Sequence, residues 1–457
     1  MLSTAASRFD RRPEEIVVSK AGPAQRTIGR TAALMLPLQL LFRAGEGALP
    51  LLLAAWFGRN EATDLFFLYA TYFAFAGSLV SGGLQDSVLV PILTEIHARN
   101  PSGLQGVVSS LLGYAVVVAC AVATALGGTA FLFALLRIHG PLLISAAGLS
   151  ALFALHLVAV SARSLLVAQL NAREYYLAHP VASGLGFGLT LVVIALLRQR
   201  LGVVAVPLGL FLGEALAISL LAPFTTLALG VHLRPSLARP EPLRRFFRLV
   251  LSDVAGATIT RVNPVIDQLV AATTGVVGGG TILRYATEVG SVPTTLLQAT
   301  LLPILLSRLS SGALTSSLRA FEKTLKSALA LTVAALGVVA GILVLVRKPF
   351  LRLLFLHGAM DADAVDSMAS VLPWATVGSV PFGVLLVLAR AHVALQNTRI
   401  MLALGIANAT LNVLLDLMLV KVAGLRGIAF ATSVVHLIIA VLLWQAMRRR
   451  LDLVVER

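Results

Sequence analysis

The sequence has few of the residues that stabilise soluble proteins. Only one cysteine, Cys120, is found among 457 residues, which excludes an intramolecular disulfide. Charged residues make up 12% of the chain and aromatic residues 6%, whereas hydrophobic residues make up 58%. A soluble domain has a very different balance, so the composition predicts a protein embedded in a lipid bilayer. The low aromatic content also argues mildly against a drug-binding cavity lined with aromatic rings.

Several functional motifs are absent from the sequence as well. It has no P-loop, no nucleophile elbow and no Cys/His cluster, so we expect neither an ATP-driven pump nor an enzyme, and no covalent cofactor. No basic patch interleaved with aromatic residues is present to bind nucleic acid. Residues 1–27 are polar and basic and lack the apolar core of a signal peptide.

Long apolar segments dominate what remains. Runs of about 20 residues or more, enough to cross a hydrocarbon core of roughly 30 Å, follow one another along the chain. They predict an all-α polytopic membrane protein with about twelve transmembrane helices. The predicted spans are 30–57, 64–93, 105–134, 141–170, 178–197, 202–230, 249–275, 280–307, 320–346, 366–392, 398–420 and 425–447.

Short motifs recur at a separation of about half the chain. Four such matches occur in the same order in both halves, which indicates an internal duplication. Six spans separate the halves, so both keep the same orientation and form two six-helix lobes around an axis along the membrane normal. The matches pair Tyr69-Ala70-Thr71 with Tyr285-Ala286-Thr287, Pro91-Ile92-Leu93 with Pro303-Ile304-Leu305, His139-Gly140 with His357-Gly358, and Ala162-Arg163 with Ala389-Arg390.

The positive charges predict the orientation. Lys and Arg gather in both tails, in the loop between the halves and in the loop after span 280–307, and these regions share one side, which is cytoplasmic by the positive-inside rule. Topology and contact with anionic lipids therefore account for the net charge of +15. The predicted organisation is a cytoplasmic tail 1–29, an N-lobe 30–233, a cytoplasmic linker 234–248, a C-lobe 249–447 and a cytoplasmic tail 448–457.

Charged residues inside the spans are the main functional candidates. A charge at the centre of a bilayer costs roughly 2.5–3.5 kcal/mol and is tolerated mainly where it faces a cavity or a partner. Arg163 and Arg390 lie near cytoplasmic helix ends, where we expect them to snorkel. The deeper candidates are Arg43, Glu46, Asp86, Glu214, Arg261, Asp267, Arg284, Glu288 and Asp416. Two pairs among them, Arg43/Glu46 and Arg284/Glu288, have a spacing at which the two opposite charges of the pair could form an ion pair on one helix.

Several segments in order resemble one known family. FGRNEATDLFF (57–67) and VLVPILTE (88–95) resemble the start of the MurJ/MviN lipid II flippases, which belong to the multidrug/oligosaccharidyl-lipid/polysaccharide exporter superfamily (MOP) that also contains the MATE transporters. LLFLHGAMDADAV (353–365), LARAHVALQNTRIMLALGIANATLN (388–412) and GLRGIAFATS (424–433) resemble its second lobe. The resemblance implies a V-shaped bundle in the bacterial cytoplasmic membrane. Its cargo would be an undecaprenyl-diphosphate-linked glycan moved by alternating access, with membrane lipids and cell-envelope synthesis proteins as partners.

Some, but not all, of the family's cargo-binding residues have a counterpart in this sequence. The family's cavity arginine in its first helix matches Arg43, and its arginine in the eighth helix matches Arg284 or, in another register, Glu288. Arg261 could assist them in holding a diphosphate. The family's other two cavity arginines fall on Leu49 and on Gly77 or Ser78, and its last two helices follow the twelfth span, where this chain ends.

The sequence also has counterparts of the residues that form the family's cation site. Asn412 and Asp416 lie four residues apart, so both oxygens face one side of span 398–420. With Asp267 and Thr432 they match the family's sodium site, a set of hard oxygen ligands that suits Na⁺. The same aspartates could instead carry a coupling H⁺, or the four residues could form a hydrogen-bonded cluster between helices.

Three function classes follow from these residues. The first is a flippase for lipid II or a similar lipid-linked oligosaccharide, in peptidoglycan or cell-wall biosynthesis or polysaccharide export. The second is a cation-coupled drug or metabolite antiporter of the MATE type, and the third is a non-transporting scaffold. A diphosphate needs cations in the cavity and an organic cation needs the reverse, so the charge of the cavity discriminates between the first two.

Overall fold

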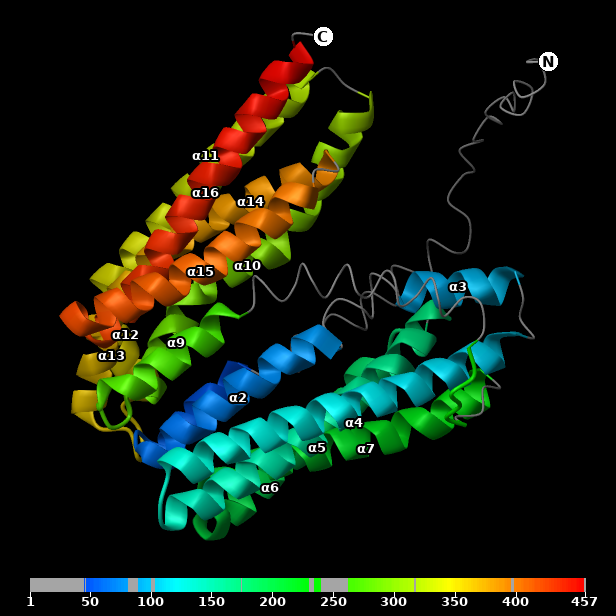
Figure 1. The fold of residues 1–457 in the computed structure, drawn as a ribbon, viewed down its shortest axis with the longest axis vertical. Coiled ribbons are helices and arrows are strands. Elements are labelled where there is room, and N and C mark those ends of the chain that lie inside the picture. Colours follow the sequence, from blue (N-terminus) through cyan, green and yellow to red (C-terminus); the bar gives the residue numbers. More distant parts are fainter. Residues whose placement is uncertain are drawn as a thin grey trace.

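The computed structural model describes residue 45 and residues 47–80, 89–99, 103–173, 175–229, 234–239, 262–315, 318–395 and 398–455. Within these residues the chain is helical and contains no strand, as the fold class predicted. A first helix, Gly47–Phe57, precedes those labelled in Figure 1. The labelled elements are α2 (Glu61–Val80), α3 (Val90–Arg99), α4 (Leu104–Arg137), α5 (Pro141–Ala172), α6 (Ala178–Leu201), η3 (Gly202–Val204), α7 (Ala205–Leu229), α9 (Asn263–Ala271), η4 (Ala272–Thr274), α10 (Gly279–Thr315), α11 (Leu318–Leu345), α12 (Arg347–Phe355), α13 (Ala362–Val377), α14 (Ser379–Ala394), α15 (Thr398–Ala423) and α16 (Leu425–Val455).

Seven helical segments within the described residues are long and apolar enough to cross a membrane. One of them, Ala178–Leu227, contains both α6 and α7, and another, Ala362–His392, contains α13 and α14. Each of the twelve predicted spans overlaps at least one described helix. The short basic helix α12 was not predicted, because its nine residues are too few to span and were assigned to a loop.

Left-handed glycines recur in both halves and fit the duplication. Backbone positions with positive φ favour glycine because a side chain with a Cβ atom is strained there, so such positions mark fixed turns. Gly202 (φ 57°) lies between α6 and α7, and Gly424 (φ 58°) lies between α15 and α16 in the other half. Two more pairs at a similar separation are Gly58 with Gly275 and Gly140 with Gly358.

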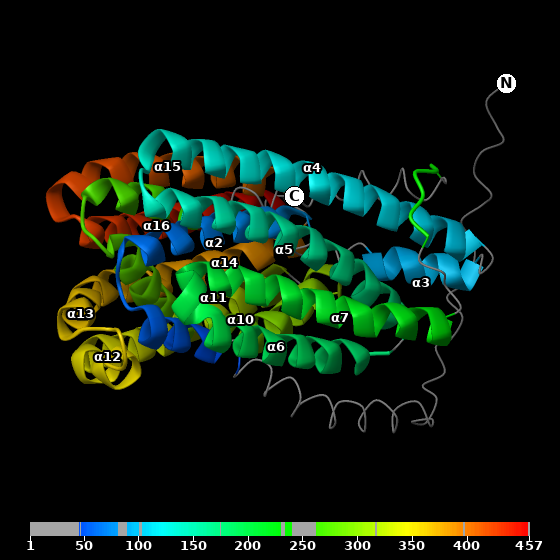
Figure 2. The ribbon, with the colours of Figure 1, turned by 90° about the horizontal axis from the view of Figure 1, so that it is seen from below.

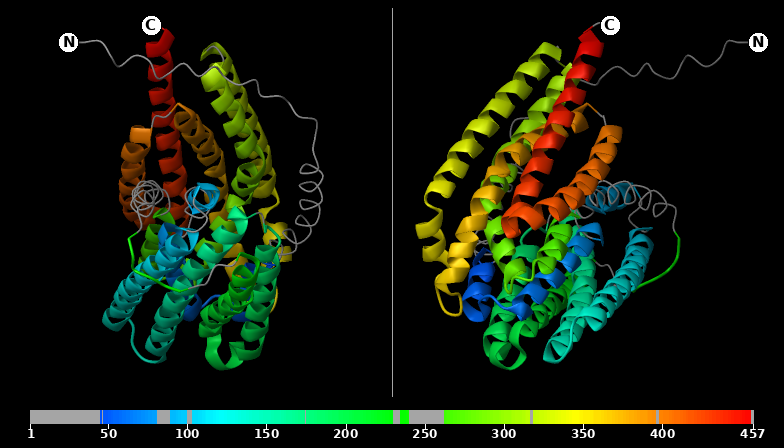
Figure 3. Two further views of the ribbon diagram at one scale, coloured as in Figure 1. Left: turned by 90° about the vertical axis from the view of Figure 1, so that its right-hand side faces the viewer. Right: turned by 60° about the vertical axis from the view of Figure 1, so that its left-hand side comes forward.

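The helices form two bundles arranged as a V (Figure 1). The N-lobe contains Gly47–Phe57 and α2–α7, and the C-lobe contains α9–α16 (Figures 1 and 3). The view from below shows α2 running between the two bundles (Figure 2). The lobes meet near the start of α2 and diverge toward the end at which the C-terminus lies (Figure 1).

At the closed end of the V, one contact joins the backbones of the two lobes directly. The amide of Ala359 donates to the carbonyl of Ala55 at 2.8 Å. The approach requires glycine on both sides, because a Cβ on Gly358 would lie 2.1 Å from the Ala55 oxygen and one on Gly58 would lie 2.3 Å from the Ala359 oxygen. The Arg59–Asp361 ion pair, with Nε and Oδ1 3.4 Å apart, completes the contact.

The start of the predicted linker packs on the N-lobe. The amide of Ser236 donates to the carbonyl of Ser109 in α4 at 2.9 Å, and the Tyr114 hydroxyl donates to the Leu237 carbonyl at 3.0 Å. Gly113 allows the close approach, since a Cβ there would lie 2.1 Å from the Ser236 oxygen. Residues 234–239 therefore pack against α4 at the open end of the N-lobe.

Candidate functional site

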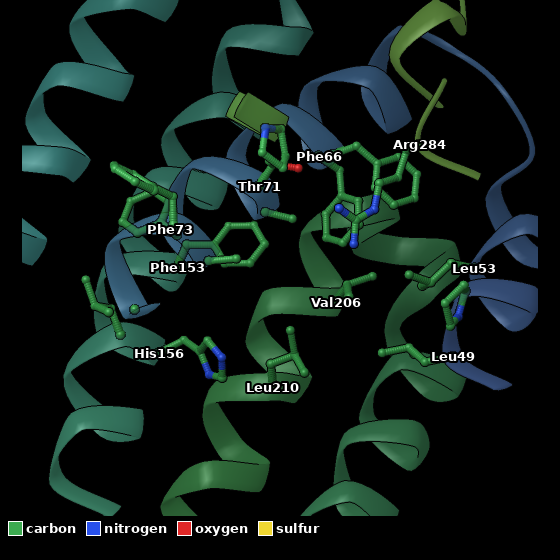
Figure 4. A pocket seen from close by; sticks show the side chains of 18 of the residues that line it. Leu49, Leu53, Phe66, Thr71, Phe73, Phe153, His156, Val206, Leu210 and Arg284 are labelled. Carbon is green, nitrogen blue, oxygen red and sulfur yellow. The ribbon is translucent and has the colours of Figure 1, made fainter. Parts of the chain in front are cut away.

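A cavity of about 700 Å³ lies between the lobes. Helices α2, α5 and α7 and the first helix supply its N-lobe wall, and α10 supplies most of its C-lobe wall (Figure 4). The described residues that line it include only five with polar or charged side chains. They are Thr71, Ser78 and His156 on the N-lobe and Arg284 and Glu288 on α10.

The N-lobe wall of this cavity is aromatic. Phe66, Phe67, Phe73, Phe75 and Phe153 all line it. Phe73 stacks on Phe153 with ring centroids 5.6 Å apart, and Phe66 lies 5.8 Å from Phe153. The wall is thus richer in aromatic side chains than the chain as a whole, and the low overall aromatic content gave no indication of it.

Arg284 and Glu288 face the cavity as a pair on α10. Arg284 Nε lies 3.5 Å from Glu288 Oε2, and the two side chains remain 38% and 39% exposed. The structure therefore contains the intrahelical pair that the sequence left open, in a loose geometry that leaves both groups accessible. The other two predicted cargo residues, Arg43 and Arg261, lie outside the described residues.

A second cavity, of about 340 Å³, lies within the C-lobe and shares Arg284 and Glu288 with the first. Asp267 on α9 and Thr432 on α16 also line it, together with His436, which stacks on Phe382 with ring centroids 4.5 Å apart. The two cavities therefore connect the pair on α10 with the predicted cation site.

The structure brings all four predicted cation ligands together. The Asn412 amide nitrogen donates to Asp267 Oδ1 at 2.9 Å and to Asp416 Oδ2 at 2.8 Å. The Thr432 hydroxyl donates to Asp267 Oδ2 at 3.3 Å, and it lies 3.5 Å from Asn412 Oδ1. One helical turn toward the open end, Asn408 donates to Asn263 at 3.2 Å, so the polar contact between α9 and α15 spans two turns.

The chemistry of this cluster fits a small hard cation. Asn412 and Asp416 are fully buried, and no donor among the described residues bonds to Asp416 Oδ1. Two adjacent carboxylates in low dielectric need a compensating positive charge, which a cation or a proton supplies. Among the described residues no group of three His, Cys, Asp or Glu side chains is placed to hold a metal.

Arg163 does not snorkel as expected. Its Nε donates to Glu214 Oε2, which joins α5 to α7, and its Nη1 lies 3.4 Å from His179 Nδ1 on α6. Both partners of the ion pair have side chains only 18% exposed. The expectation was wrong because an intramembrane partner 51 residues away outweighs the path to the interface.

Asp64 is a functional candidate that the sequence analysis did not single out. Its carboxylate accepts hydrogen bonds from the amides of Gly278 and Thr281, each at 2.7 Å, and from the Thr281 hydroxyl at 2.8 Å. A side chain of the N-lobe thus caps the N-terminus of α10 in the C-lobe. The neighbouring Thr63 bonds to the same Thr281 at 3.0 Å. The segment FGRNEATDLFF contains Asp64, but nothing in it identifies a partner in the other lobe.

Sequence comparisons identify related proteins. A family profile described as "Lipid II flippase MurJ" matches residues 53–457. A probable lipid II flippase MurJ of Vibrio cholerae serotype O1 is 26% identical over 233 residues, covering 50% of this chain and 44% of that protein. One of Rhizobium tropici is 25% identical over 313 residues, covering 66% of this chain and 57% of that protein. The chain thus matches about half the length of these curated relatives.

Solved structures share the fold. A lipid II flippase MurJ in an inward closed conformation superposes with a TM-score of 0.72 at 18% identity, covering 90% of this chain and 87% of that one. A MATE family transporter of the MOP superfamily in an inward-facing conformation gives 0.71 at 16% identity, covering 92% and 96%. An outward-facing MATE transporter of that superfamily gives 0.62.

Proposed function

The chain belongs to the lipid II flippase MurJ family, and on that premise we propose that it moves an undecaprenyl-diphosphate-linked glycan across the membrane by alternating access. The observation that carries the proposal is the cavity between the lobes, with Arg284 exposed to it from the second turn of α10. A guanidinium stays charged when partly desolvated and can bind two phosphate oxygens at once. Arg284 is therefore the described residue best suited to hold a diphosphate.

The two ends of the V support alternating access. The lobes are joined at one end by the Asp64 cap and by the contact between Gly58 and Gly358, and they diverge at the other. An outward-open state would require these contacts to break and the open end to close. These polar contacts lie beside a hydrophobic cluster shared by both lobes, in which Phe67 meets Tyr285 with ring centroids 5.1 Å apart. An outward-open state would have to separate both kinds of contact.

We propose that the cluster of Asp267, Asn412, Asp416 and Thr432 holds a coupling Na⁺. When bound, the ion would supply the positive charge that the two buried carboxylates need. The residues present would bind it through carboxylate, amide and hydroxyl oxygens, the ligands that hard cations prefer. A coupling H⁺ on the same aspartates is the alternative. In either case the second cavity places the cluster beside Arg284 and Glu288.

We further propose that the protein lies in the bacterial cytoplasmic membrane with both tails in the cytoplasm. The last turns of α16 and residues 234–239, which include Arg234 and Arg239, lie at the open end of the V. The positive-inside rule would make this end the cytoplasmic one. The cavity would then open toward the side where lipid-linked precursors are made. The predicted lobes, 30–233 and 249–447, would be the two bodies that move.

Complementation tests the function directly. In a bacterium depleted of its own lipid II flippase, this chain should restore growth and Arg284→Ala should not, although both insert in the membrane. Arg284→Lys should restore growth only in part, because an ammonium lacks the planar fork. Growth supported equally by wild type and Arg284→Ala would contradict the proposal.

One observation favours a second candidate, a cation-coupled antiporter of the MATE type. The aromatic wall and Glu288 would suit an organic cation. Under that account Glu288→Gln would abolish transport while Arg284→Ala would spare it. The flippase account predicts the opposite order of severity.

A further inference from the structure

Within the part of the chain that the structure describes, three buried polar atoms around the inter-lobe cavity have no hydrogen-bond partner. They are Thr71 Oγ1 on α2, His156 Nδ1 on α5 and Arg284 Nε on α10, and all three residues line the cavity. Buried polar atoms are nearly always paired in proteins, so an unpaired set around one cavity calls for a ligand. Arg284 has its loose contact with Glu288, but Thr71 and His156 have no such neighbour for these atoms.

The two N-lobe atoms belong to helices that pack on each other, α2 and α5. Leu210 on α7 lines the cavity together with His156. Figure 4 shows Thr71 on the side of the cavity where Arg284 enters from the other lobe and the His156 ring beside Leu210, with Phe153 between Thr71 and His156. The hydroxyl of Ser78 provides a contrast, since it donates to the carbonyl of Phe75 at 2.6 Å.

The surroundings of these atoms are neutral and aromatic. Phe73 and Phe153 form a stacked pair on the same wall, and the described N-lobe residues lining the cavity include no Lys, Arg, Asp or Glu. Apolar faces with a few fixed hydrogen-bonding groups suit a ligand that has both ring faces and hydroxyl or amide groups. The charged pair is confined to the opposite wall, on α10.

We propose that the N-lobe wall is a sugar subsite, in which Thr71 and His156 hydrogen-bond to the sugar nearest the diphosphate and the apolar side chains of that wall pack against its ring. Arg284 holds the diphosphate from the other lobe. The inference rests on the proposed flippase function and adds which lobe recognises which part of the cargo. A headgroup bound in this way would contact the N-lobe through its sugar and the C-lobe through its diphosphate.

The variants separate hydrogen bonding from packing. Thr71→Val removes the hydroxyl at nearly constant shape. His156→Asn keeps an amide group near the position of Nδ1 and loses Nε2, whereas His156→Gln keeps a group near Nε2 and loses Nδ1. Thr225→Val is the matched control, because Thr225 is fully buried and its hydroxyl donates to the Leu221 carbonyl of its own helix.

The probes are undecaprenyl diphosphate and undecaprenyl diphosphate linked to one N-acetylhexosamine, titrated against purified protein in nanodiscs. Thr71→Val and His156→Gln should each weaken binding of the sugar-bearing lipid by about 3- to 10-fold, the loss expected for one hydrogen bond. Binding of the bare diphosphate should change less than about twofold in the same variants. His156→Asn should bind the sugar-bearing lipid better than His156→Gln, and Arg284→Ala should weaken both lipids alike.

Equal weakening of both lipids by Thr71→Val and His156→Gln would overturn the inference, as would no effect on either lipid. Tighter binding by His156→Gln than by His156→Asn would mean that Nε2, not Nδ1, contacts the sugar, and would also overturn it. Failure of the flippase proposal would look different: wild-type protein would bind neither lipid, or Arg284→Ala would bind both as wild type does.

Discussion

Removing the Asp64 carboxylate should open the closed end of the V. Three hydrogen bonds from Gly278 and Thr281 end on this carboxylate. Each bond to a charged group contributes about 1.5–3 kcal/mol, and the N-terminus of α10 adds up to about 1 kcal/mol. Because such contributions are not additive, we expect Asp64→Ala to destabilise the closed state by about 3 kcal/mol. The equilibrium between the state in which this end of the V is closed and the state in which it is open would then shift by about 100-fold toward the open state.

Distances between spin labels across the closed end would measure the shift. The exposed residues Leu136 and Leu353 are suitable label sites, one on each lobe, in a Cys120→Ser background. Asp64→Ala should add a longer distance to the distribution. Asp363→Ala, which removes an exposed acidic residue from the first turn of α13, should leave the distribution unchanged. An unaltered distribution in Asp64→Ala would refute the argument that this cap holds the lobes together.

Three further predictions concern other contacts. Na⁺ in place of choline should raise the unfolding temperature of the wild type and not of Asp416→Asn, because ligand binding stabilises only a folded site; a rise in both would remove the site from the account. Arg163→Ala and Glu214→Ala should each lower the free energy of unfolding by about 3 kcal/mol, with the double variant losing less than the sum; additive losses would mean that the pair does not interact. Gly358→Ala should reduce the yield of a disulfide between cysteines introduced as Arg59→Cys and Asp361→Cys, because residue 358 has a φ of 63° and its new Cβ would lie 2.1 Å from the Ala55 oxygen. The control Gly341→Ala, whose Cβ would meet nothing within 4 Å, should leave the yield unchanged. Equal yields in the two variants would contradict the close approach.

Much of the fold was predictable because the bilayer leaves few choices. A backbone in hydrocarbon must satisfy its own hydrogen bonds, so apolar runs long enough to span become helices. The repeat was visible in motifs such as Tyr69-Ala70-Thr71 and Tyr285-Ala286-Thr287, whose tyrosines are both buried in the core. The helix α12 was missed, since a short basic segment carries no spanning signal.

The site was predictable where helical spacing brings residues together and not where tertiary contact does. Asn412 and Asp416 share a helix face by their spacing alone, and Arg284 and Glu288 do so in the same way. Asp64 with Thr281, and Arg163 with Glu214, pair across helices that only the fold brings together. The aromatic wall was likewise invisible, because phenylalanines lining a cavity have the same sequence pattern as phenylalanines in a core.

The central claim is that Arg284 holds the cargo's diphosphate in an inter-lobe cavity during transport. Flipping of a fluorescent undecaprenyl-diphosphate-linked glycan in proteoliposomes tests it most directly. We expect transport by the wild type, partial transport by Arg284→Lys and none by Arg284→Ala, with Glu288→Gln less damaging than Arg284→Ala. Transport by Arg284→Ala at the wild-type rate would contradict the claim.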